Sequence, residues 1–204
     1  MQLRAAWTIA VLVTLFAAEP VSVRSAGAQS PPSPKSDAAT FDADKGRVLD
    51  ALFAALHRSA GDAEADAVVA QIWATWSGSG KSDIDLMMAK ASGAMQSRNY
   101  GLAVLLLDEV VDEAPLFAEG WNRRATLRFT MGDHAGALAD VDKVLALEPR
   151  HFGALAGRGM IHMAAEKWEQ ALEAWRAALK ANPFLKERHG VIPELQRRVE
   201  KGRL

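Results

Sequence analysis

The sequence predicts an all-α fold built from repeated helical units, and three observations predict it. A pattern of 34 residues occurs three times in succession, with a bulky residue, a small residue, a turn and a proline in the same order. Within each block, apolar residues recur at the spacing of one helix face. Cysteine is absent, which excludes a disulfide-stabilised fold. Repeats of about 20 to 50 residues are typical of solenoids, in which each unit buries its apolar face against the next.

Prolines and alanines define the period of the repeat. They stand at Pro115, Pro149 and Pro183, and at Ala103, Ala137 and Ala171. Because proline makes up about 5% of residues in an average protein, two successive matches arise by chance on the order of once in 400 cases. The repeat is therefore a property of the chain.

The middle block, residues 118 to 151, carries the pattern most completely. It contains Trp121, Ala125, a turn at Gly132 and Pro149. In length and order this block resembles the tetratricopeptide repeat, a helix-turn-helix unit that stacks into a right-handed solenoid. The resemblance implies an all-α, right-handed solenoid of about eight to nine helices in the mature chain. Its three clear repeats are residues 84 to 117, 118 to 151 and 152 to 185.

Small residues occupy the positions where the helices of such a solenoid approach closely. At Ala91, Ala125 and Gly159 we expect the two helices of one repeat to meet, and at the alanines of the period we expect contact with the next repeat. A larger side chain at these positions would overpack the contact at a cost of about 1–3 kcal/mol.

Residues 44 to 83 are expected to form an N-terminal helical hairpin. Two apolar faces at helical spacing, the second with Trp73 and Trp76, flank a break at Gly61. Phe53 and Trp73 also fall in the 34-residue register of the clear repeats. We therefore predict a degenerate repeat, residues 50 to 83, stacked on the first clear one, as terminal units often are.

The first 28 residues have the features of a secretory signal peptide. Arg4 precedes an uncharged apolar run, which is shorter than the roughly 20 residues that span a bilayer. Small residues at Ala26 and Ala28 predict cleavage before Gln29. The expected location is outside the cytoplasm, and periplasmic in a host with two membranes. An uncleaved membrane anchor is the alternative.

Residues 29 to 43 are rich in proline, serine and alanine and show no apolar period. Such a segment buries too little surface to offset its ordering entropy, so we expect a flexible linker. A proline-rich ligand is the alternative.

Residues 186 to 204 depart from the register and are expected to form a C-terminal capping helix. Pro193 suits the first position of this helix, with Leu195 and Val199 facing inward. Its positive charges are expected to form a solvated face, with a phosphate- or membrane-binding patch as the alternative. The positive side chains are Arg197, Arg198, Lys201 and Arg203.

No pattern of residues predicts catalysis, a cofactor or a metal. The five histidines are not at metal-ligand spacings, and the glycine-containing runs do not fit a phosphate-binding loop. The net charge of −1 provides no basic surplus for nucleic acid. We therefore expect a non-enzymatic protein without cofactor, metal or nucleic-acid partner, whose mature chain is not inserted in a membrane.

The resemblance implies a partner-binding groove lined by the first helix of each repeat. In each of these helices the second, fifth, ninth, twelfth and thirteenth positions face the ligand, and Glu119 and Gly153 take the second position in the last two repeats. The predicted partner-binding residues are Met88, Ser92, Met95, Asn122, Thr126, Phe129, Met160 and Met163. Methionine is polarizable and flexible, so this groove would adapt to apolar peptide or helix faces. Packing of Met95, Phe129 and Met163 within the core is the alternative.

Some family members grip the terminal carboxylate of a peptide with lysine, arginine and asparagine in the groove. This chain has Met88 and Ser92 where that clamp needs Lys and Asn in the first repeat, and Gly153 and Gly157 replace its basic residues in the third. We therefore expect no carboxylate capture, and Asn122 and Arg123 are the best polar groups for a peptide backbone.

The predicted function is that of a protein-binding adaptor or scaffold. Its expected partner is a peptide or helical segment of an envelope protein, held in the groove. The alternative is structural self-association into a homo-oligomer through the N-terminal hairpin, whose Trp73 and Trp76 would pair with another copy.

Overall fold

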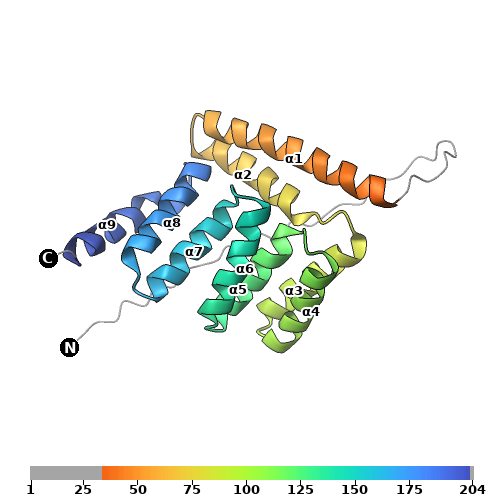
Figure 1. Ribbon diagram of the computed structural model, residues 1–204. Coiled ribbons are helices and arrows are strands. Elements are labelled where there is room, and N and C mark those ends of the chain that lie inside the picture. Colours follow the sequence, from red (N-terminus) through yellow and green to blue (C-terminus); the bar gives the residue numbers. More distant parts are fainter. Residues whose placement is uncertain (1–33, 203–204) are drawn as a thin grey trace. The chain divides into compact units, whose positions relative to one another are not determined.

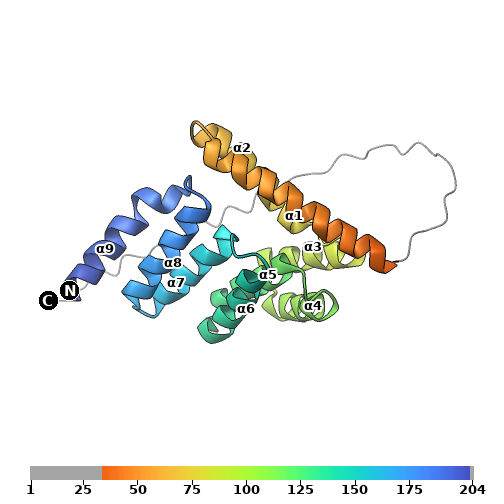
Figure 2. The same cartoon turned by 45° about the horizontal axis from the view of Figure 1, so that its top comes forward.

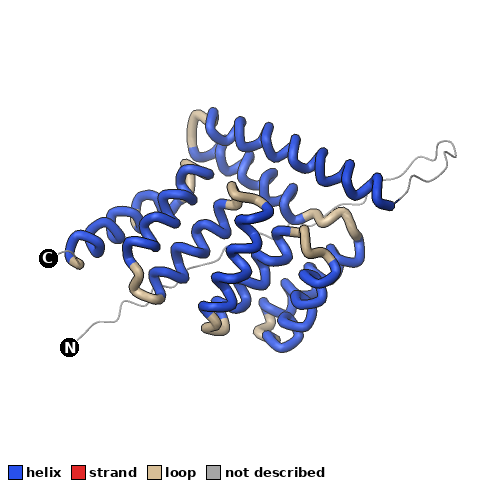
Figure 3. Tube along the Cα trace, in the orientation of Figure 1, coloured by secondary structure: helices blue, strands red, loops and turns tan. Residues whose placement is uncertain are grey.

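The computed structural model describes residues 34 to 202. The predicted signal peptide and the first part of the predicted linker lie outside the described residues. Within residues 34 to 202 the secondary structure is entirely helical, as predicted (Figure 3). The helices are α1 (Pro34–Arg58), α2 (Asp62–Ser77), α3 (Ser82–Gln96), α4 (Tyr100–Glu113), α5 (Ala118–Thr130), α6 (His134–Leu147), α7 (Phe152–Ala164), α8 (Trp168–Ala181), the short 3₁₀ helix η1 (Lys186–His189) and α9 (Val191–Lys201).

Three antiparallel pairs, α3 with α4, α5 with α6 and α7 with α8, form a stack. Helix α5 also packs on α4 of the preceding pair and α7 on α6, and α9 packs in the same way on α8 (Figure 1). At Gly120 of α5 a Cβ atom would lie 2.8 Å from the Val110 side chain of α4. At Gly159 of α7 it would lie 2.6 Å from the Trp175 ring of α8. Only a residue without a side chain allows these two approaches.

Local sequence signals begin and end the paired helices. Asn99 and Asp133 cap α4 and α6, because their side-chain oxygens accept hydrogen bonds from the backbone N–H groups of Leu102 (3.3 Å) and Gly136 (2.9 Å). The turn inside each pair places one residue in the left-handed region. These residues, at the same repeat position, are Arg98 (φ 57°), Gly132 (φ 84°) and Glu166 (φ 56°).

Ion pairs between neighbouring repeats accompany the apolar contacts. Arg124 of α5 reaches back to Asp108 of α4 at 2.8 Å, and Arg158 of α7 reaches Asp142 of α6 at 2.5 Å. Arg124 also contacts the buried Asp140 at 2.9 Å. Burial lowers the pKa of Arg124, but the hydrogen bonds and charges of Asp140 and Asp108 outweigh it, so the pKa lies above its ordinary value and the guanidinium stays charged.

The N-terminal hairpin (α1 and α2) does not stack on the first repeat, and that prediction was wrong. It lies instead across one end of the paired helices, along the loops that join the repeats (Figures 1 and 2). Its apolar residues form one core cluster with residues of the third repeat and the loop after it. The buried members are Leu49, Phe53, Leu56, Ala65, Ile72, Trp76 and Phe152, with Trp73, Phe184 and Leu185 packed against them.

Polar contacts follow the hairpin along the loops. Lys45 lies 5.3 Å from the centre of the Phe117 ring, and Asp50 accepts a hydrogen bond from Arg150 at 2.7 Å.

The outer face of the first repeat is not covered by the hairpin. Leu86 lies on the face of α3 that corresponds to the buried Gly120 in α5, and its side chain is 55% exposed. A stacked repeat would cover Leu86. The 34-residue register of Phe53 indicates which side of the helix is apolar. It does not determine which part of the protein that side packs against.

Helix α1 also begins earlier than predicted. It starts at Pro34, inside the segment that was expected to be a flexible linker, rather than at residue 44. Proline is tolerated in the first turn of a helix, because the N–H group that it lacks has no partner there.

Candidate protein-binding groove

The N-terminal hairpin covers the part of the groove where the first helices of the repeats begin. Glu119 of α5, predicted to face the ligand, is only 2% exposed. Gly153 holds the matching position in α7, and a Cβ atom there would lie 2.6 Å from the Trp73 ring of α2. The groove is therefore partly filled by the chain itself.

Glu119 lies in a buried polar cluster beneath the hairpin. Its carboxylate accepts hydrogen bonds from Asn122 Nδ2 at 2.8 Å and from a terminal nitrogen of Arg123 at 3.0 Å. His151 Nε2 lies 3.3 Å from the second carboxylate oxygen atom, Oε2. Burial alone raises the pKa of Glu119, but the partners His151, Arg123 and Asn122 together hold it below its ordinary value. Glu119 is therefore a charged carboxylate inside the protein.

His151 connects this cluster to the hairpin. Its Nδ1 accepts a hydrogen bond from the backbone N–H of Ala154 at 3.1 Å, which caps α7. The ring proton is therefore on Nε2, which faces Glu119. The imidazole is fully buried and stacks on Trp76 with ring centroids 4.0 Å apart. No solvent reaches the imidazole. His151 and Glu119 therefore hold the hairpin against the repeats and do not form a site for a substrate.

Sequence reasoning did not find this cluster. Glu119 was assigned to the open groove, and His151 was considered only as a metal ligand and rejected. The available signal was the position of His151 directly before α7, where a side chain commonly accepts a hydrogen bond from the first turn of the helix.

Most of the predicted partner-binding residues lie beyond the part that the hairpin covers. Thr126 is exposed, and Asn122 is partly exposed. The Thr126 hydroxyl donates to the Asn122 carbonyl at 3.0 Å, and the Ser92 hydroxyl donates to the Met88 carbonyl at 2.9 Å. These contacts leave the hydroxyl oxygen atoms available as acceptors.

Met88 is a correction to the predicted groove. We expected it to be exposed, but its side chain is 8% exposed and belongs to the core of the first repeat, with Ile84 and Phe117 among its cluster. Phe117, which directly precedes α5, belongs to the same core cluster as Met88. Met88 therefore contributes to folding rather than to an open surface.

The other apolar groove residues are half-buried and do not form one cluster. Met95 packs on the core of the first repeat, Phe129 on that of the second, and Met160 and Met163 on that of the third. Phe129 also stacks on His134, with ring centroids 5.3 Å apart. Each residue thus serves its own repeat with one side and leaves another side accessible.

Neither a metal centre nor a membrane span is found in the part of the chain that the structure describes. No group of three or more histidine, aspartate or glutamate side chains among residues 34 to 202 is arranged to hold a metal ion. No helix among these residues is both long and apolar enough to cross a bilayer.

The repeats match a known family and a curated relative. The tetratricopeptide repeat model matches residues 88–152 and 122–186. A tetratricopeptide repeat-containing protein of Rhizobium etli is 38% identical over 135 residues, which is 66% of this chain and 66% of that protein. The chain therefore spans about two thirds of the length of this relative.

Solved structures share the fold. The first repeat domain of Spaghetti (RPAP3), bound to an HSP90 peptide, is 20% identical and has a TM-score of 0.55, with 57% of this chain and 93% of that one covered. The Sgt2 domain of Aspergillus fumigatus is 19% identical with a TM-score of 0.56, and 60% and 83% are covered. The yeast Sti1 domain TPR2B in complex with pHsp70 is 18% identical with a TM-score of 0.53, and 60% and 99% are covered. Through residues 88 to 186, this chain belongs to the tetratricopeptide repeat family.

Proposed function

We propose that this chain is a non-enzymatic adaptor that binds a peptide or helical segment of another protein in the open part of its groove. Two proteins of the same fold form such complexes, Spaghetti with an HSP90 peptide and the Sti1 domain with pHsp70. The observation that carries the proposal is the accessibility of Thr126, Met160 and Met163 beyond the hairpin. They lie on α5 and α7, which contact each other directly.

The chemistry of this open part favours an apolar ligand face. None of the predicted partner-binding residues carries a charge, and thioether side chains adapt to irregular apolar surfaces. Hydroxyl and amide groups of Thr126 and Asn122 provide polar contacts for a peptide backbone. A helix with one apolar face fits this pattern better than an acidic peptide terminus.

The hairpin limits the length of ligand that the groove accepts. Because Trp73 lies over Gly153 and Glu119 is buried, a ligand contacts only the later turns of α5 and α7. At 1.5 Å per residue, the last two turns of a helix are about 11 Å long, which is close to the diameter of one ligand helix that crosses them.

We further propose that the chain is exported and that its partner is an envelope protein. The support is the pattern of residues 1 to 28, with Arg4, the apolar run and the small residues before Gln29. N-terminal sequencing of the protein purified from a producing bacterium tests whether the chain is exported and cleaved. A mature chain that starts at Gln29 supports export, and a chain that retains Arg4 contradicts cleavage.

Self-association through the hairpin has weaker support. The hypothesis required Trp73 and Trp76 as free apolar surface, but both pack within the chain and Trp76 is 2% exposed. Light scattering at about 100 μM separates the two functions, because mass action favours any homo-oligomer at high concentration. A monomer at that concentration agrees with the adaptor.

Photocrosslinking tests the groove. A photoreactive residue at Thr126 or Met160 is expected to capture the same partner, whereas one at Ala139, exposed on α6, is expected to capture none. Thr126→Glu should abolish capture while the melting temperature stays unchanged, because the Thr126 side chain is exposed. Equal labelling from Thr126 and Ala139 would remove the groove assignment.

A further inference from the structure

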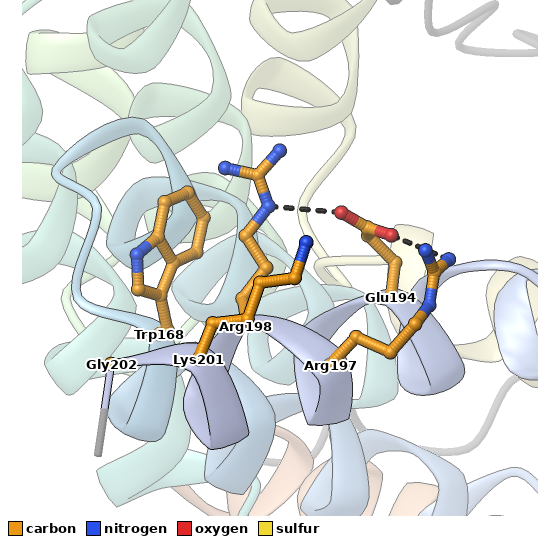
Figure 4. Close-up of a pocket in the computed structure, with 6 residues that line it drawn as sticks. All are labelled: Trp168, Glu194, Arg197, Arg198, Lys201 and Gly202. Carbon is orange, nitrogen blue, oxygen red and sulfur yellow. Dashed lines mark hydrogen bonds and ion pairs between the residues drawn. The ribbon is translucent and has the colours of Figure 1, made fainter. Parts of the chain in front are cut away.

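A hollow of about 460 Å³ lies between the start of α8 and one side of α9 (Figure 4). Its walls are formed by one aromatic side chain, three basic side chains, one carboxylate and the glycine that follows α9. These residues are Trp168, Glu194, Arg197, Arg198, Lys201 and Gly202. The volume is in the range of sites that hold a small ligand or one to two side chains of a partner.

The carboxylate of Glu194 positions the two arginines. Its Oε1 accepts a hydrogen bond from Arg198 Nε at 2.9 Å, and its Oε2 lies 2.5 Å from a terminal nitrogen of Arg197. The hydrogen bond from Arg198 is the largest influence on Glu194, and it lowers the pKa of this carboxyl group. Since three basic groups face one carboxylate, the hollow has an excess of two positive charges.

Arg198 is fixed from two sides. Its guanidinium lies 4.7 Å from the centre of the Trp168 ring, while its Nε is bound to Glu194 (Figure 4). Within residues 34 to 202 its two terminal nitrogens make no hydrogen bond, and Lys201 makes no ion pair. A guanidinium held in this way presents a prepared pair of N–H donors, which matches the two oxygens of a carboxylate.

We propose that this hollow is a second binding site, which takes an acidic segment of a partner protein. A carboxylate of that segment pairs with Arg198 and Lys201, and an adjoining aromatic or aliphatic side chain lies against Trp168. The site is formed by α8 and α9 alone, so it does not depend on the function proposed for the groove.

The charges around the hollow favour a discrete acidic segment over a membrane or nucleic acid. A neighbouring hollow of about 200 Å³ is lined by Glu169, Glu173 and Arg176, so its acidic side chains outnumber its basic one. A phospholipid surface or a phosphate backbone presents negative charge over a wide area and would meet these carboxylates as well. A peptide places one or two carboxylates at the basic side chains and leaves the glutamates free.

Calorimetric titration with a short synthetic peptide tests the proposal. The peptide carries Phe-Glu-Glu between Gly-Ser flanks, and the matched control peptide carries Phe-Gln-Gln in the same place. The full chain is expected to bind the glutamate peptide alone, more weakly as salt rises. Arg198→Gln and Lys201→Gln should each weaken binding about fivefold, the effect of one exposed ion pair. Lys143→Gln, the same change on α6, should leave binding unchanged.

Parallel experiments test whether the variants are folded and whether other anions bind at the hollow. Leu195 and Val199 hold α9 on α8, so the variants should melt as the native chain does. Equal binding of both peptides, or full binding by Arg198→Gln and Lys201→Gln, overturns the proposal. It is also overturned if phosphatidylserine vesicles, rather than the peptide, bind in a way that depends on Lys201. Inorganic phosphate that competes with the peptide supports the assigned anion position.

Discussion

The indole of Trp76 lies flat on the imidazole of His151, with the ring centroids 4.0 Å apart and the planes 11° from parallel. Trp76 belongs to the N-terminal hairpin, and His151 directly precedes the third repeat. His151 also faces Glu119 of the second repeat at 3.3 Å, and its Nδ1 accepts a hydrogen bond from Ala154 of the third repeat. This stack therefore joins the hairpin to two repeats, and the coverage of the groove depends on it.

Truncation of Trp76 is expected to destabilise the whole unit. Trp76→Ala removes a buried ring that touches Phe53, Phe152 and His151, so the free energy of unfolding should fall by about 3–5 kcal/mol. Chemical denaturation measures this loss. Val48→Ala, at an exposed position of α1, is the matched control and should cost less than about 0.5 kcal/mol. If both variants unfold like the native chain, the hairpin is not docked as described.

The charge of Glu119 makes stability depend on pH. The folded chain holds the pKa of Glu119 below the ordinary value of 4.5. The contribution of its charge is therefore complete above that value and is lost as the pH falls through the lower folded pKa. Glu119→Gln should cost about 1–3 kcal/mol at neutral pH, because it leaves Arg123 and His151 without their anion.

Acid denaturation series measure this effect. The difference in unfolding free energy between the native chain and Glu119→Gln should be constant near neutral pH and shrink toward acid. For Val48→Ala, which removes no ionisable group, the corresponding difference should not change with pH. A difference that grows toward acid would mean that Glu119 is protonated in the folded chain.

The 34-residue period was sufficient to predict the three repeats, because close packing restricts the residue types at the positions that define it. The predicted second and third repeats begin at residues 118 and 152, where α5 and α7 begin. Gly159 was predicted at a close helix contact, and its backbone does meet the Trp175 ring. Such positions tolerate few residue types, so they can be recognised as closely packed from a single sequence.

The position of the hairpin and the burial of Met88 could not be predicted in the same way. An apolar face tells which side of a helix is buried, and Trp73 has the same periodicity whether it meets the first repeat or the third. Glu119 shows the same limit, since its burial depends on a hairpin that docks from a distant part of the sequence. Only the tertiary contacts decide between these arrangements.

The left-handed turn residues allow a stabilising change. Arg98 and Glu166 adopt positive φ at the position that Gly132 holds in the second repeat. A side chain with a Cβ atom costs about 1–2 kcal/mol in this region, so Arg98→Gly and Glu166→Gly should each raise stability. The gain should be below about 1 kcal/mol, because glycine also increases the entropy of the unfolded chain. Gly132→Ala should have the opposite sign, and thermal melts of the three variants test the series.

Two glycines of α7 should respond oppositely to the same substitution. At Gly159 a Cβ atom would lie 2.6 Å from the Trp175 ring, so Gly159→Ala forces α7 and α8 apart at a cost of about 1–3 kcal/mol. At Gly157, in the same helix, a Cβ atom meets nothing within 4 Å. There alanine only removes the entropic penalty of glycine in a helix, so Gly157→Ala should stabilise by about 0.5–1 kcal/mol. Both effects are read from denaturation midpoints. Because helix propensity alone favours alanine at both positions, a stabilising Gly159→Ala would show that the two helices are not in contact at this point.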